Sequence, residues 1–229
     1  MPRLILIETS TSLCSAALSE GGRIICSRRS DEGRAHASLT AVFVNEMLNQ
    51  AGWKVSDCDA VAISSGPGSY TGLRVGSGTA KGLCFGADIP LIAVDTIRLL
   101  VDMVEDRGLA SRDVRHIVPM IDARRMEVYC AVYSREGSGF TRRGEISNVI
   151  VDKDSFPGIN GDKCLFVGDG ALKCKGILEG EFVELLPEAE GLLKSAGQAF
   201  DEKRFEDIAY FEPFYLKNFV ATVSRKKLF

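Results

Sequence analysis

Residues 65–76 read Ser-Gly-Pro-Gly-Ser-Tyr-Thr-Gly-Leu-Arg-Val-Gly, a glycine-rich turn between an apolar segment at 59–64 and a helical pattern from about 72 to 86. Backbone N–H groups at such a strand-to-helix turn can face an anion. The known phosphate loops do not match, because Thr71 stands where G-x-G-x-x-G requires its last glycine and no Gly-Lys follows Gly76 at the Walker offset. Two interpretations stay open, an anion site and a tight turn that uses glycine for its unusual dihedral angles.

The segments around this turn predict an α/β order for the first half of the chain. Short apolar or alternating runs predict strands at 4–7, 12–19, 23–29, 59–64 and 91–94, with a hairpin turn at Gly21-Gly22. Apolar residues recurring every three to four positions predict helices at 35–51, 72–86 and 96–107. The predicted order is βββαβαβα.

The second half repeats this order without repeating the letters. Strands are predicted at 114–121, 126–133, after the turn at 137–139, and at 165–167, with helical patterns at 171–178 and 188–200. The opening strand of each half ends in an acid, Glu8 or Asp122. A duplicated βββαβαβα unit implies two α/β lobes, residues 1–100 and a degenerate 101–229, with any ligand in the cleft between them.

Composition excludes several classes of protein. The 229 residues are 45% apolar and 26% charged with a net charge of −3, which excludes a disordered chain and does not indicate a dedicated nucleic-acid module. Seven cysteines, no C-x-x-C and two histidines offer no zinc ligand set, and the cysteines are interpreted as small buried apolar residues in a reducing compartment. The apolar run near the N-terminus is too short for a signal peptide, and no apolar segment approaches the length of about 20 residues that a membrane-spanning helix needs. We therefore expect a cytoplasmic protein without membrane contact.

One contrast in charge lies near the C-terminus. Residues 181–212 hold nine acids and three bases, whereas residues 213–229 hold four bases and no acid. These bases are Lys217, Arg225, Lys226 and Lys227. They form either a solvated face or a set of phosphate contacts.

The helix after the glycine-rich turn carries Gly72, Gly76, Gly78, Gly82 and Gly86. Each interior helical glycine costs about 0.5–1 kcal/mol relative to alanine, so the series indicates close approach of another backbone, from the chain's own sheet or from a partner. The helix at 35–51 offers an apolar stripe that fits a glycine groove. We therefore predict a partner interface and self-association through Leu39, Phe43, Met47, Gly72, Gly78 and Gly82.

The residues for independent catalysis are missing or altered. An actin-like ATPase or sugar kinase has Asp-x-Gly-Thr after its first strand, whereas Glu8 and Ser10 stand at those places here. No H-E-x-x-H or G-x-S-x-G motif occurs. We predict no catalytic residue, metal ligand or cofactor-binding residue. A ribonuclease-H-like nuclease would need clustered carboxylates, and the only candidates are Glu8, Asp95 and Asp122.

Four motifs together resemble the TsaB family, formerly called YeaZ: residues 7–11 (Ile-Glu-Thr-Ser-Thr), residues 66–76, residues 121–124 (Ile-Asp-Ala-Arg) and residues 215–218 (Tyr-Leu-Lys-Asn). Residues 151–210 match only in general length. The resemblance implies a two-lobed actin-like (ASKHA, ribonuclease-H-like) fold and a non-catalytic scaffold subunit of the bacterial tRNA threonylcarbamoyladenosine machinery. It implies a homodimer in isolation and a complex with TsaD, which holds metal and nucleotide, joined by the ATPase TsaE. tRNA is then met through the complex, with the four C-terminal bases as candidate contacts.

An enzyme remains the alternative. It would be a small ATPase or phosphotransferase of the actin-like or sugar-kinase class that uses the cleft between the lobes. ATP binding by the isolated chain separates the two hypotheses.

Overall fold

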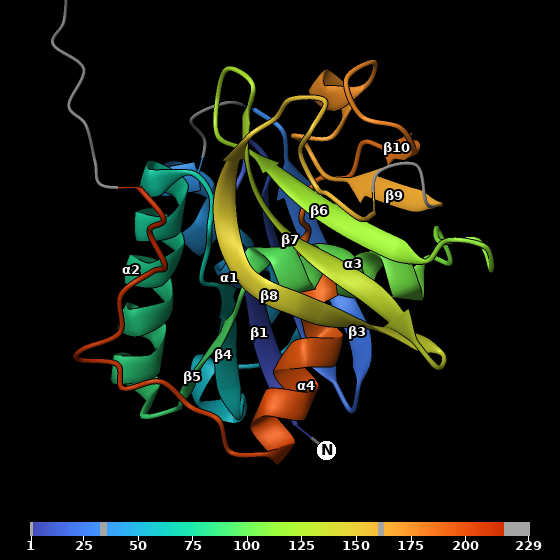
Figure 1. Cartoon of the computed structure of the whole chain (residues 1–229). Coiled ribbons are helices and arrows are strands. Elements are labelled where there is room, and N and C mark those ends of the chain that lie inside the picture. The colour runs from blue at the N-terminus through green and yellow to red at the C-terminus, as the bar shows by residue number, and fades with distance from the viewer. Residues whose placement is uncertain (1, 33–35, 160–162, 218–229) are drawn as a thin grey trace, which may run out of the picture.

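The computed structural model describes residues 2–32, 36–159 and 163–217 and contains two five-stranded sheets (Figure 1). The first sheet has the order β3-β2-β1-β4-β5, in which β1 pairs antiparallel with β2 and parallel with β4. Its strands are β1 (Arg3–Glu8), β2 (Cys14–Glu20), β3 (Arg23–Ser30), β4 (Ala60–Ser64) and β5 (Leu91–Val94). Gly21 and Gly22 have positive φ in the predicted hairpin turn between β2 and β3.

Helices cover both faces of the first sheet. They are α1 (His36–Ala51), α2 (Tyr70–Ala87) and α3 (Thr96–Asp106), with a short 3-10 turn η1 (Val55–Asp57) before β4. The predicted order βββαβαβα is confirmed for this half. The helix after the glycine-rich turn begins earlier than predicted, because the Ser69 side chain caps it by accepting a hydrogen bond from the Gly72 N–H.

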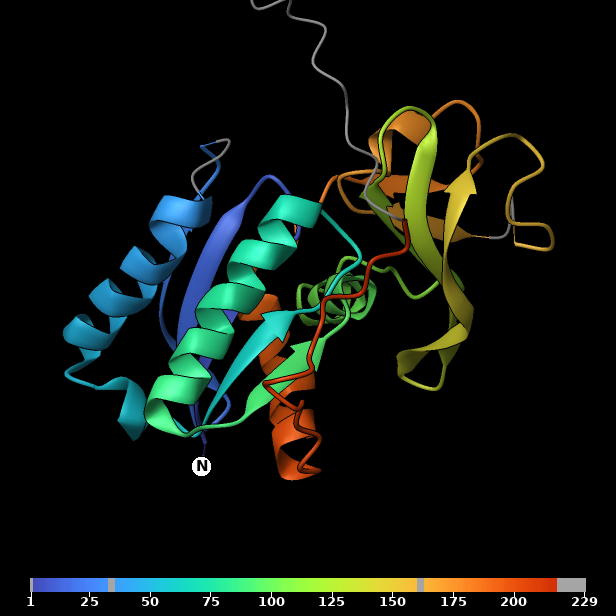
Figure 2. The same cartoon turned by 90° about the vertical axis from the view of Figure 1, so that its left-hand side faces the viewer.

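The central strand β1 is buried on both faces, which explains its continuous apolar run. Ile5 and Ile7 join the apolar cluster under α1 and α2, whereas Leu4 and Leu6 join the cluster that contains α3. Successive side chains of a strand point to opposite faces, so α1 and α2 lie on one side of the sheet and α3 on the other (Figure 2).

The second sheet repeats the topology of the first. Its order, β10-β9-β6-β7-β8, places β6 where the first sheet has β1, antiparallel to β7 and parallel to β9. The strands are β6 (His116–Asp122), β7 (Glu127–Glu136), β8 (Gly139–Ile150), β9 (Cys164–Val167) and β10 (Glu181–Val183). The predicted strands are confirmed as β6, β7, β8 and β9, whereas the short β10, which completes the repeated topology, was not predicted.

The helices of the second half differ from the prediction. The pattern at 171–178 forms only a 3-10 turn, η2 (Leu172–Cys174), because the chain turns at Gly176 with φ of 93°. The pattern at 188–200 divides into η3 (Ala189–Leu192) and α4 (Leu193–Asp201). No helix separates β8 from β9 in the described residues. The prediction that the second half repeats the whole βββαβαβα order is therefore wrong for the helices, although the five-stranded sheet is repeated.

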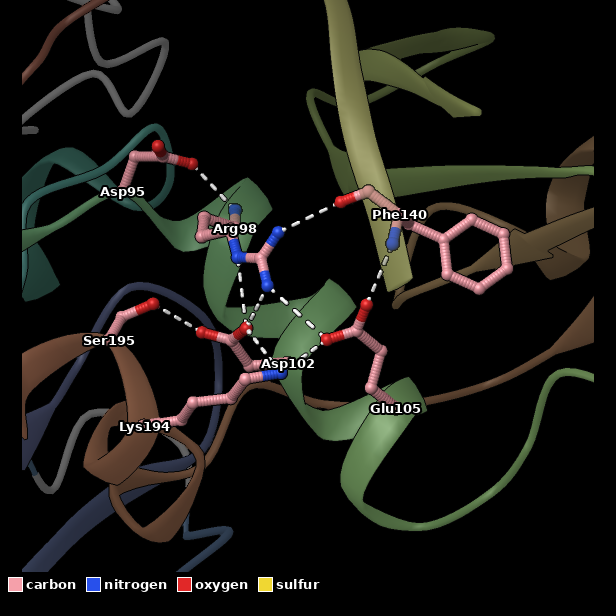
Figure 3. Close-up of polar contacts among 7 residues, drawn as sticks. All are labelled: Asp95, Arg98, Asp102, Glu105, Phe140, Lys194 and Ser195. Atoms are coloured by element: carbon pink, nitrogen blue, oxygen red, sulfur yellow. Dashed lines mark hydrogen bonds and ion pairs between the residues drawn. The ribbon is translucent and has the colours of Figure 1, made fainter. Parts of the chain in front are cut away.

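The inner faces of the two sheets share one apolar cluster with α3 and α4 between them (Figures 1 and 2). A polar network around the fully buried Asp102 carboxylate connects the elements of this layer (Figure 3). Arg98 of α3 donates to Asp102 at 2.9 Å and to the Phe140 carbonyl of β8 at 3.2 Å. The Phe140 N–H in turn donates to Glu105 at 2.9 Å, and Lys194 of α4 pairs with Glu105 at 2.5 Å. The network therefore connects α3 to β8 of the second sheet and to α4.

The terminal segment, residues 202–217, returns to the first sheet. The Glu206 N–H donates to the Leu91 carbonyl at 2.9 Å, and the Phe214 N–H donates to the Ser65 carbonyl at 2.7 Å. Lys81 of α2 donates to the Phe211 carbonyl at 3.0 Å. The predicted division into residues 1–100 and 101–229 stays a prediction; α3 runs across residue 100, and the terminal segment packs on the first half.

The cysteines fill the interior as predicted. Six of the seven are buried, none is in a disulfide, and burial raises the pKa of the Cys130 thiol to about 12. No helix in the described ranges is long and apolar enough to cross a bilayer.

Candidate functional site

One face of α2 is open in this chain. Outside the backbone of α2 itself, a methyl group placed on Gly78, Gly82 or Gly86 would meet no atom of the described residues within 4 Å. Phe85 lies on the same face, because helical residues three and four apart are neighbours, and it is 86% exposed. We call Gly78, Gly82, Phe85 and Gly86 the α2 strip. α1 packs on one side of α2 and the terminal segment on the other (Figure 2).

The stripe predicted on α1 is only partly accessible. Met47 is fully buried in the apolar cluster under α1 and α2, where it packs the chain's own core. Leu39 and Phe43 are half-buried, and Val42 beside them is 44% exposed. Of the three predicted knobs, Leu39 and Phe43 can therefore contact a partner, and Met47 cannot without unfolding.

Gly72 and Gly76 face the chain itself. A Cβ on Gly72 would lie 2.0 Å from the Thr9 carbonyl oxygen, and one on Gly76 would lie 2.3 Å from Thr9 Oγ1. The Thr9 hydroxyl donates to the Gly72 carbonyl at 2.8 Å, and the Ser69 N–H donates to the Ser10 carbonyl at 2.6 Å. Contact with the loop after β1 therefore accounts for Gly72, so the predicted interface narrows to Leu39, Phe43, Gly78 and Gly82. The Ser69 N–H at the start of α2 is thus already bonded to the Ser10 carbonyl and does not face an anion.

Glu8 is fully buried at the end of β1. Its Oε1 accepts hydrogen bonds from the N–H and the hydroxyl of Ser10, both at 2.5 Å, while Oε2 has no hydrogen-bond partner among the described residues. Burial raises the pKa of Glu8, and the charge of Asp169 after β9 adds to the rise. Burial also raises the pKa of Asp169 to about 6. In both carboxyls burial disfavours the charged form relative to an exposed carboxyl.

Polar residues at the end of β6 bond to one another. Lys173 forms an ion pair with Asp122 and donates to the Glu127 carbonyl at 2.7 Å. The Asp122 N–H donates to Asp169 at 2.8 Å. Within the described part of the chain, no group of three or more His, Cys, Asp or Glu side chains is placed to hold a metal ion.

A hollow of about 530 Å³ lies where the terminal segment crosses the ends of β4 and β5. Ser65, Tyr210 and Phe214 line it together with four carboxylates, Asp95, Glu206, Asp207 and Glu212. Such a lining repels the phosphates of a nucleotide.

The structure bears on two further sets of predicted residues. Lys217 forms an ion pair with Glu127 of β7, whereas Arg225, Lys226 and Lys227 lie outside the described residues. Phe85 was not among the predicted interface residues, although its position three residues after Gly82 indicates that the two share a face of the helix.

Known proteins are similar to this chain over nearly its whole length. The family model described as TsaD, tRNA N6-adenosine threonylcarbamoyltransferase, matches residues 30–219. The tRNA threonylcarbamoyladenosine biosynthesis protein TsaB of Escherichia coli K12 is 32% identical over 96% of this chain and 96% of its own length. The TsaB protein of Haemophilus influenzae is 31% identical over 98% of this chain and 96% of its own length.

Solved structures have the same fold. YeaZ from Pseudomonas aeruginosa superposes with a TM-score of 0.83 at 29% identity, covering 94% of this chain and all of that one. A Pseudomonas aeruginosa protein described as similar to peptidase YeaZ gives a TM-score of 0.82 at 28% identity, over 95% of this chain and all of that one. A polyphosphate/ATP-glucomannokinase from Arthrobacter has a TM-score of 0.50 at 10% identity over 88% of this chain and all of that one, which shows the two-lobed actin-like fold alone.

Proposed function

This chain belongs to the TsaB family of tRNA threonylcarbamoyladenosine biosynthesis proteins, and on that premise we propose that it is a non-catalytic scaffold subunit. In this proposal the α2 strip, with Leu39 and Phe43 of α1, binds and activates a TsaD-like catalytic subunit.

The observation that carries the proposal is the open glycine series on α2. The two interior glycines, Gly78 and Gly82, cost roughly 1–2 kcal/mol together relative to alanine, and nothing in the described part of the chain approaches either of them or Gly86. A helix from a partner can pack its backbone closely against such a strip. Phe85, nearly fully exposed here, then adds apolar area to the contact.

The opposite side of α2 supports the non-catalytic part of the proposal. The glycine-rich turn is closed against Thr9, and the nearby hollow is lined by carboxylates. We therefore assign metal, nucleotide and transfer chemistry to the TsaD-like subunit, with a TsaE-like ATPase joining the pair. In isolation two copies of this chain associate through the same strip. A two-fold axis between the copies brings the strip of one against the strip of the other, so that the two apolar faces cover each other.

The test is Gly82→Leu. No atom of the described residues outside α2's own backbone lies within 4 Å of its Cβ position, so the isolated chain should fold normally by circular dichroism. The leucine side chain should prevent close approach of a partner helix. We expect loss of TsaD-like subunit binding in calorimetry and loss of the homodimer in sedimentation. Gly197→Leu in α4, also without neighbours within 4 Å, is the matched control and should bind normally.

Two results would contradict the proposal. Wild-type affinity of a folded Gly82→Leu chain places the interface elsewhere. Tight binding of ATP with magnesium to the isolated wild-type chain, followed by turnover, favours the phosphotransferase alternative.

A further inference from the structure

Polar contacts join α3 to β8 of the second sheet at both ends of the helix. At its start, the Asp95 carboxylate accepts a hydrogen bond from the Arg98 N–H at 2.6 Å and pairs with Arg142 of β8 at 3.3 Å. Further along, the Arg98 guanidinium donates to the Phe140 carbonyl at 3.2 Å, and the Phe140 N–H donates to Glu105 at 2.9 Å (Figure 3). One residue of β8 is thus bonded through both of its backbone groups to two turns of α3.

The same side chains continue to the first sheet through α4, which packs against β5. The fully buried Asp102 accepts a hydrogen bond from Arg98 at 2.9 Å and another from the Ser195 hydroxyl of α4. Lys194 of α4 pairs with Glu105 at 2.5 Å. An unbroken series of polar contacts therefore runs from β8 through α3 to α4 (Figure 3).

The terminal segment makes a second connection between the two halves of the chain. Its Phe214 N–H donates to the Ser65 carbonyl at the end of β4 at 2.7 Å, and Lys217 forms an ion pair with Glu127 of β7. The second sheet is therefore tied to the first at β7 as well as at β8.

These contacts restrict motion in a way that the shared apolar cluster does not. Burial of apolar surface has no directional preference, so apolar side chains can slide over one another while they stay buried. Hydrogen bonds require short distances and near-linear geometry, so a slip of β8 by one residue, about 3.3 Å, breaks both bonds of Phe140. The buried Asp102 charge adds to this restriction, because it needs its partners in place.

We propose that these contacts form a latch that holds the two sheets at one fixed orientation, so that the chain moves as a single rigid body. The latch consists of Asp95, Arg98, Asp102, Glu105, Phe140 and Arg142. Two-lobed proteins commonly close about a hinge when a ligand enters between the lobes. In this chain the latch prevents that motion, and its own side chains set the angle between the lobes. This inference is independent of the proposed function.

The distance between spin labels on the two halves tests the latch, measured by double electron–electron resonance on the full chain. Asn49→Cys in α1 and Glu145→Cys in β8 place the labels at exposed positions. Cys26→Ser removes the one native cysteine that is not buried, and dilution with unlabelled chain removes distances between copies. We expect a single narrow distance distribution that does not shift when ATP and magnesium are added.

Arg98→Met with Arg142→Gln removes two of the contacts between α3 and β8, and it should broaden this distribution and add a second maximum. Exchange of the Phe140 amide hydrogen, followed by NMR, should become about tenfold faster, although its acceptor Glu105 is retained. A purely local role of the two arginines would leave this amide unchanged.

Arg135→Met is the matched control. It removes an arginine that donates to the carbonyls of Val114 at 2.8 Å and Ser111 at 2.9 Å, both outside the latch and on the side of the second sheet. The control should leave the distance distribution and the Phe140 exchange rate as they are in the wild-type chain.

Every outcome supports or overturns the latch. An unchanged distribution in the folded double variant overturns it, because the apolar cluster then sets the orientation alone, and equal broadening in the Arg135→Met control overturns it as a general loss of stability. A shift of the wild-type distribution on addition of ATP and magnesium shows a closing hinge and also overturns it.

If the double variant does not fold, Arg142→Gln with Lys217→Gln takes its place, since both side chains are partly exposed. Broadening then supports the latch, and an unchanged distribution overturns it. Failure of the latch leaves the proposed function standing, because none of these measurements involves the α2 strip or a partner subunit.

Discussion

Replacing Gly78 and Gly82 by alanine should stabilise the isolated chain. Both positions lie inside α2, and a Cβ at either meets nothing within 4 Å. Alanine in a helix interior stabilises the helix by roughly 0.5–1 kcal/mol relative to glycine. The free energy of unfolding of the double variant should therefore be about 1–2 kcal/mol higher than that of the wild-type chain. For a chain of this size that raises Tm by about 2–8 °C.

Gly76→Ala in the same helix is the matched control and should have the opposite effect. Its Cβ would stand 2.3 Å from Thr9 Oγ1, so Thr9 must move and its hydrogen bond to the Gly72 carbonyl is strained. Overpacking of this kind typically costs about 1–3 kcal/mol, which exceeds the gain in helix propensity.

Urea denaturation followed by circular dichroism measures both effects. Protein concentration must stay below the dimerisation range, because self-association through the α2 strip would stabilise the wild-type chain by mass action. Destabilisation by Gly78→Ala with Gly82→Ala in the monomer would refute the reasoning, since it would mean that the chain itself covers this face. Stabilisation by Gly76→Ala would refute the close contact with Thr9.

Two further changes probe the buried polar groups. Asp102→Ala removes the carboxylate that accepts hydrogen bonds from Arg98 and Ser195, and it leaves the Arg98 guanidinium without its main partner. The free energy of unfolding, measured by urea denaturation, should therefore fall by about 3–5 kcal/mol. A loss below about 1 kcal/mol would show that the network is not rigid. The raised pKa of Asp169, about 6 against about 3.9 in the unfolded chain, means that the folded state binds the proton more tightly, so this group lowers stability progressively as pH rises from about 4 to about 6. Asp169→Asn should remove that part of the pH dependence and be more stable than wild type above pH 6, and equal stability of the two proteins across this range would contradict the assignment.

Local patterns in the sequence determined most of the first half. The apolar run of β1, the glycine pair between β2 and β3 and the helical period of α1 each depend on neighbouring residues, so they could be located without the fold. The same kind of pattern located four of the five strands of the second sheet, β6 to β9, but neither β10 nor the order of the strands within the sheet. Helices in the second half could not be predicted as reliably, because the pattern at 171–178 is apolar enough for a helix but Gly176 turns the chain.

The candidate site depended on contacts between distant residues. The glycines of α2 look alike in the sequence, yet Gly72 contacts Thr9 from 63 residues away, while a Cβ on Gly82 would meet no residue that the structure describes. Met47 and Phe85 are both apolar helical residues, and only the packing of α1 and α2 on the sheet buries one and exposes the other. Periodicity specifies which residues share a face of a helix, but which face meets the core is settled by tertiary packing, because burial depends on what the rest of the chain brings to that face.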